Sequence, residues 1–93
     1  MATSAICIWR LALESEWDVK YEGIKHDFEK LLVAKSKFKI LVFQASGQDV
    51  TDYYKKLEQG IHTYQGGSSG EVYLLACYDN DKEEFEIKRI EGA

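Results

Sequence analysis

Two glutamates at the end of an apolar run are the residues best placed for chemistry in this sequence. Glu14 and Glu16 directly follow the stretch 6–13, which is almost continuously apolar and typical of a strand buried on both faces. Because side chains alternate along an extended chain, both glutamates should project to the same side. Carboxylate oxygens are the ligands that Mg²⁺ and Mn²⁺ prefer, so the pair predicts a site for a divalent cation.

The positive groups that such a site needs lie in the segment that follows. Lys30 and His26 are four residues apart, which places them on one face of a helix. Phosphodiester cleavage requires a metal, an activated water and a positive group near the phosphate. We therefore predict catalytic roles for Glu14, Glu16 and Lys30, with the two glutamates as metal ligands. His26, and Lys20 in the polar loop before the helix, are the predicted contacts to the substrate.

A regular α/β arrangement is expected to position these residues. Apolar residues at helical spacing predict two amphipathic helices, over 24–35 and 50–64. Apolar runs predict strands over 6–13, 37–44, 71–79 and 84–90, the last half-exposed because Phe85 and Ile87 alternate with charged residues. The order strand–helix–strand–helix–strand–strand predicts a single α/β domain, residues 1–93. Its sheet should be mixed and mostly parallel, with the helices packed on it.

At the two glutamates and the helix that follows, the chain resembles the PD-(D/E)XK, or restriction-endonuclease-like, superfamily. In that family a strand ends in E-x-K and is followed by a helix and a parallel strand. Here the motif reads Glu14-Ser15-Glu16. Some members carry E-x-E, or have the lysine on the following helix, which makes Lys30 the counterpart. The resemblance covers residues 6–45 in motif and most of the chain in element order. It implies a partial core related to Mg²⁺- or Mn²⁺-dependent cleavage of nucleic acid.

The chain also departs from the family's pattern. The first carboxylate of the family is an aspartate on an antiparallel strand before E-x-K, and only five residues precede Ile6. The helix and hairpin that come earlier in the family are not predicted either. The chain therefore resembles the second half of such a core, and either an active nuclease or a scaffold that lost the reaction fits that description.

The composition and charge indicate which classes of protein the chain resembles. Hydrophobic residues make up 45% of the 93 residues, and the formal net charge is -4. An acidic chain is unlike a protein that coats nucleic acid, although acidic metal ligands are compatible with a nuclease. No apolar run approaches the ~20 residues of a membrane span, and no basic signal-peptide region is present, so we expect a cytoplasmic protein. Cys7 and Cys77 lie in apolar runs and are expected to be reduced core thiols.

A second, non-enzymatic hypothesis stays open. A small acidic α/β domain could act as an interaction or inhibitor protein, with a homodimer or a partner protein covering the exposed edges of its sheet. The last strand, 84–90, is the expected two-fold contact of a self-associating version. A thioredoxin-like redox enzyme is disfavoured because the sequence has neither a CxxC motif nor a proline.

Overall fold

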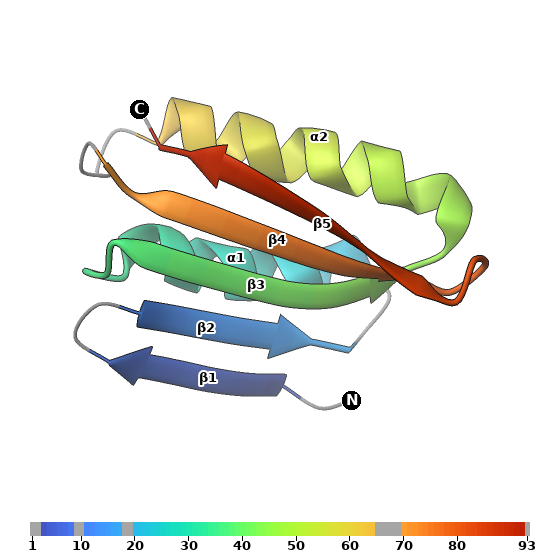
Figure 1. Cartoon of the computed structure of the whole chain (residues 1–93), viewed down its shortest axis with the longest axis horizontal. Helices are drawn as coiled ribbons and strands as arrows, with labels where there is room; N and C mark the ends of the chain where they lie inside the picture. The colour runs from blue at the N-terminus through green and yellow to red at the C-terminus, as the bar shows by residue number, and fades with distance from the viewer. Residues whose placement is uncertain (1–2, 9–10, 18–19, 65–69, 93) are drawn as a thin grey trace.

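The computed structural model describes residues 3–8, 11–17, 20–64 and 70–92. The fold is α/β, and it contains the strand–helix–strand–helix–strand–strand order that the sequence predicts, with one more strand at the beginning (Figure 1). The elements are β1 (Thr3–Ile8), β2 (Leu11–Glu16), α1 (Tyr21–Val33), β3 (Phe38–Ala45), α2 (Gly47–Thr63), β4 (Val72–Asp79) and β5 (Glu84–Glu91).

The strands form one mixed sheet in the order β1-β2-β3-β4-β5. The central strands β2, β3 and β4 run parallel, while β1 and β5 pair antiparallel with β2 and β4 at the two edges. Each helix connects two adjacent parallel strands, and right-handed crossovers in one direction place both helices on the same face of the sheet. In Figure 1 both helices lie behind the sheet, so the described part of the chain has two layers.

The first predicted strand is in fact a pair of strands, and this part of the prediction is wrong. The chain forms β1, which ends at Ile8, and β2, which begins at Leu11, with these two residues opposite each other in an antiparallel pair. Apart from Arg10 the residues on both sides are apolar, and no glycine, proline or asparagine marks a turn, so the pattern offered little sign of a break. As a result β2 extends to Glu16, and the two glutamates lie within the strand instead of beyond its end.

The core lies between the sheet and the two helices. The buried residues of α2 recur at the three- and four-residue spacing of an amphipathic helix, and alternate residues of β3 and β4 meet them from the sheet. Aromatic contacts join the layers, with ring centroids 6.4 Å apart for Phe28–Tyr73 and 5.8 Å apart for Phe43–Tyr54. The largest fully buried apolar side chains are Ile24, Leu31, Leu41, Phe43, Leu57, Tyr73 and Leu75.

The opposite face of the sheet is covered by no described element. Phe38, Phe85 and Ile87 are 52%, 50% and 62% exposed, although all three are large apolar side chains. The alternation that the sequence shows in the last strand is therefore real, but its apolar side is the open side of the sheet. The charged side of β5 faces α2 instead. No helix within the described ranges is long and apolar enough to cross a membrane.

Candidate functional site

Glu14 and Glu16 are buried side chains of β2, on the side that carries the buried Ala12. Their exposed fractions are 5% and 2%, and they are two residues apart, as the predicted same-side arrangement requires. An ionised carboxylate loses hydration when it is buried, so it needs a charged or hydrogen-bonding partner nearby. Glu16 is not isolated, because it interacts with another group of the protein.

Helix α1 brings charged groups to Glu14. Asp27 is 2% exposed, and Lys30 Nζ lies 3.3 Å from its Oδ1. Burial raises the pKa of Glu14 above its ordinary value, and the Asp27 carboxylate raises it further, while Lys30 and His26 act in the opposite direction. The structure thus brings together Glu14, Lys30 and His26 from the predicted site, together with Asp27.

One oxygen of this cluster has no partner. Asp27 Oδ2 is buried without a hydrogen bond, the one such side-chain atom found in the described ranges. A buried acceptor left unsatisfied is costly, and a bound cation or an ordered water would relieve it. Asp27 was not assigned to the site from the sequence. The available signal was its spacing, because Ile24, Asp27, Phe28 and Leu31 follow the i, i+3, i+4, i+7 pattern of a buried helix face.

The carboxylates of this cluster suit a metal ion that takes few of its ligands from the protein. Within the described residues, no group of three or more His, Cys, Asp or Glu side chains is arranged to hold a metal ion. Mg²⁺ does not need such a cage, since it commonly uses one or two carboxylates and completes its shell with waters and substrate phosphates. Glu14 and Asp27, whose Oδ2 is unsatisfied, fit binding of this kind, with one or two carboxylates from the protein.

Lys20 comes directly before α1 in the chain. It is exposed, and its backbone carbonyl accepts the Ile24 N–H at 3.5 Å. The residue has further interactions of its own. Its role as a substrate contact stays a prediction.

An antiparallel strand, β1, precedes β2 in the chain and pairs with it. This corrects the expectation that too few residues precede β2 to form one. In β1, Ala5 is the backbone partner of Glu14, and Thr3 is the partner of Glu16. None of the residues Thr3–Ile8 is acidic, so β1 does not provide the family's first carboxylate.

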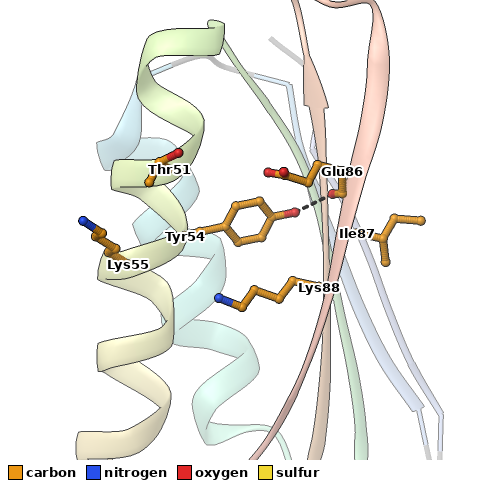
Figure 2. A pocket seen from close by; sticks show the side chains of 6 residues that line it. All are labelled: Thr51, Tyr54, Lys55, Glu86, Ile87 and Lys88. Carbon is orange, nitrogen blue, oxygen red and sulfur yellow. Dashed lines mark hydrogen bonds between the residues drawn. The ribbon is translucent and has the colours of Figure 1, made fainter.

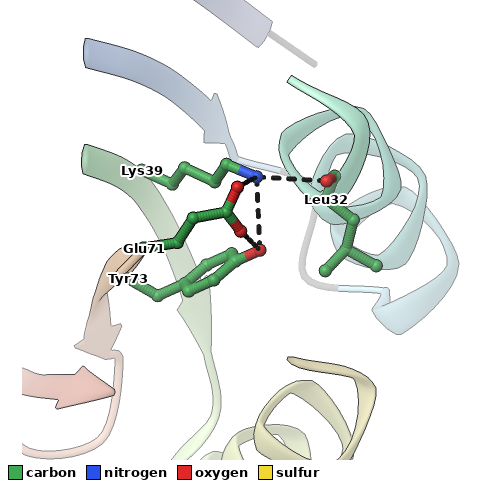
Figure 3. Close-up of polar contacts among 4 residues, drawn as sticks. All are labelled: Leu32, Lys39, Glu71 and Tyr73. Atoms are coloured by element: carbon green, nitrogen blue, oxygen red, sulfur yellow. Dashed lines mark hydrogen bonds and ion pairs between the residues drawn. The ribbon is translucent and has the colours of Figure 1, made fainter. Parts of the chain in front are cut away.

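A second polar cluster, which sequence reasoning missed, lies near the opposite end of the parallel strands (Figure 3). Lys39 Nζ is fully buried and lies 3.2 Å from Glu71 Oε2, and it donates to the Leu32 carbonyl at 3.1 Å and to Tyr73 Oη at 3.3 Å. The Tyr73 hydroxyl donates in turn to Glu71 Oε1 at 3.4 Å. The buried ammonium is compensated by a buried carboxylate and two hydrogen-bond acceptors, which is the arrangement of a structural ion pair. The sequence pattern placed Lys39 in an apolar strand and gave no sign of its partner 32 residues later.

Three cavities lined by described residues open on the surface. The largest, about 480 Å³, adjoins Glu71 at the end of α1, and one of about 280 Å³ lies at the start of α2. The third, about 330 Å³, lies between α2 and β5 (Figure 2). None of these three is lined by Glu14, Glu16 or Lys30.

Comparison of the chain with models of protein families, with curated proteins and with solved structures finds no match. What the chain does is therefore inferred from its own residues and their geometry.

Proposed function

We propose that the chain is a nuclease-like core, related to metal-dependent phosphodiester cleavage of nucleic acid, with its site between β2 and α1. The observation that supports this best is the charge cluster: Glu14 and Asp27 are buried together, and Lys30 lies at their exposed side. Two buried carboxylates beside one exposed lysine are costly for a purely structural purpose. The same arrangement suits a cation and a phosphate.

Each residue has a distinct role in this proposal. Glu14 and Asp27 would hold Mg²⁺ or Mn²⁺, and Glu16, two residues along β2, completes the E-x-E motif. The bound cation would supply an activated water and charge stabilisation at the phosphate. Lys30 is 52% exposed, so its ammonium can remain paired with Asp27 and still reach a phosphate oxygen. His26, exposed one turn earlier on α1, would contact the same phosphate backbone.

Metal binding is the first test. Mn²⁺ and Mg²⁺ titrations followed by calorimetry should show saturable binding to the wild-type chain. Glu14→Gln and Asp27→Asn should each weaken it strongly, because each replaces a charged carboxylate ligand with a neutral amide of the same shape. Glu29→Gln, an exposed glutamate of the same helix, is the matched control and should bind like wild type. Failure of the wild type to bind either cation at millimolar concentration would overturn the catalytic proposal.

Cleavage is the second test. Single- and double-stranded DNA and RNA should be cut only with Mg²⁺ or Mn²⁺ present. Lys30→Ala should slow cleavage by about 10²-fold or more, the scale of losing one electrostatic stabiliser. Lys25→Ala removes an equally exposed lysine of α1 and should leave the rate unchanged. Metal binding without cleavage of any substrate would leave a scaffold that kept its cation and lost the reaction.

A second candidate function is a self-associating interaction domain. It is favoured by the edge strand β5, where Phe85 and Ile87 are exposed and no other described strand pairs on the outer side. This function requires neither metal binding nor cleavage, so the two experiments above distinguish it from the first.

A further inference from the structure

The outer edge of β5 presents free backbone groups at known positions. The Gly92 N–H donates to the Glu71 carbonyl at 2.8 Å, and the register of β4 with β5 places these two residues opposite each other. In an antiparallel pair, hydrogen-bonded positions alternate with positions whose N–H and C=O point away. Even-numbered residues of β5 therefore bond to β4. The residues that direct N–H and C=O outward are Phe85, Ile87, Arg89 and Glu91.

Successive side chains of β5 project to opposite faces of the sheet. Glu86 and Lys88 point toward α2, and Ile87 points to the open side of the sheet (Figure 2). Lys88 Nζ already lies 2.8 Å from Glu58 Oε1 on α2. Glu86 has no ion-pair partner within the described residues. Its carboxylate lies beside the cavity of about 330 Å³ between α2 and β5, which leaves room for side chains from outside.

These features fit a second copy of the same strand in one register. If two β5 strands pair antiparallel about a two-fold axis at Ile87, Glu86 of each copy lies opposite Lys88 of the other, on the helix side. Phe85 lies opposite Arg89 on the open side, where a guanidinium can stack on the ring. The pairs 85–89, 87–87 and 89–85 are then the hydrogen-bonded pairs, and each exchanges two backbone bonds through groups that already point outward.

Other registers are unfavourable. An axis at Lys88 sets two lysines against each other at the centre of the contact. An axis at Phe85 sets Glu84 against Glu86, and an axis at Arg89 sets two arginines together. Like charges directly opposite each other destabilise strand pairing, so among these four axes the charge pattern favours the one at Ile87.

We propose that a second copy of this chain docks on the outer edge of β5 through this register, so that the two sheets become one. The proposal goes beyond the nuclease-like function and does not depend on it, since Glu14 lies on β2 and three strand positions away from β5. Strand pairing alone buries less area than a standard protein interface, so the dimer should be reversible and concentration-dependent.

Charge reversal and mixing test the register directly. Sedimentation velocity on the wild-type chain over a range of concentrations should give a monomer–dimer equilibrium. Glu86→Lys alone and Lys88→Glu alone each place like charges at both off-axis contacts, so each should weaken dimerisation by about tenfold or more. An equimolar mixture of the two variants restores opposite charges at every contact and should form a heterodimer as strong as the wild-type dimer.

Controls separate the register from net charge and from folding. Glu29→Lys and Lys25→Glu make the same charge changes on α1 and should leave dimerisation unchanged. Ile87→Pro removes an outward N–H without touching the bonds to β4, so it should weaken the dimer while circular dichroism stays that of the folded chain. A monomeric wild type at millimolar concentration, single reversals with wild-type affinity, or a mixture that does not recover would each overturn the proposal.

Discussion

At Glu14, the effect of burying a charge on stability can be measured as a function of pH. Burial, and then Asp27, raise the pKa of this carboxyl above its ordinary value of 4.5. Its contribution to stability is therefore full below pH 4.5 and is lost as the pH rises through the raised folded-state value. Glu14→Gln cannot ionise, so it should exceed wild type in free energy of unfolding at pH 7, and the difference should close near pH 4. Urea unfolding at both pH values checks this, and an equal difference at both would contradict it.

At Lys39, in contrast to Glu14, removing the buried charge is expected to destabilise the fold. The ammonium is fully buried and compensates Glu71, so Lys39→Met leaves a buried carboxylate without its cation. Breaking one side of a buried ion pair costs about 3–5 kcal/mol. The double variant Lys39→Met, Glu71→Leu removes both charges and should recover most of that loss. Denaturant unfolding of the four proteins in this cycle gives the coupling energy. Equal stability of the single and double variants would show that the pair has no specific role.

At the level of elements, Gly60 sets the distance between α1 and α2. Alanine normally stabilises a helix interior by about 1 kcal/mol relative to glycine. Here an added Cβ would lie 2.9 Å from Cε2 of Phe28, a buried ring of α1, so the packed ring or one of the helices must shift. We expect Gly60→Ala to lower the free energy of unfolding by about 1–3 kcal/mol, the usual cost of overpacking. Recovery of stability by the added change Phe28→Leu would confirm the contact, and a stabilised Gly60→Ala would exclude it.

The elements also show which parts of the structure a sequence can predict. Helix α2 was predicted because Val50, Leu57 and Ile61 repeat at helical spacing, and local periodicity determines such a helix. The β1–β2 reversal was not predicted because residues 9 and 10, Trp and Arg, are not turn formers and their neighbours are apolar on both sides. Lys39–Glu71 and the partnerless oxygen of Asp27 depend on tertiary contacts that no local pattern encodes.

At the level of the whole molecule, the two proposed surfaces lie at different positions across the sheet. The charge cluster lies where α1 crosses β2, whereas the proposed dimer contact is the outer edge of β5. A dimer through β5 would therefore keep both copies of the charge cluster away from the axis. It would also place both helical layers on one side of the joined sheet and both open apolar faces on the other, because residues opposite each other in a strand pair share a face.

The two-layer architecture itself makes a prediction about neighbouring residues of one strand. Leu75 is fully buried against the helices, whereas Leu74 faces the open side and is only partly buried. Leu75→Ala should cost about 2–5 kcal/mol, because it removes core contacts and leaves a cavity. Leu74→Ala should cost about 1 kcal/mol or less, because water already reaches that side chain. Unfolding measured at low protein concentration, which favours the monomer, makes the comparison clean. Equal costs at the two positions would mean that another part of the protein covers the open face in solution.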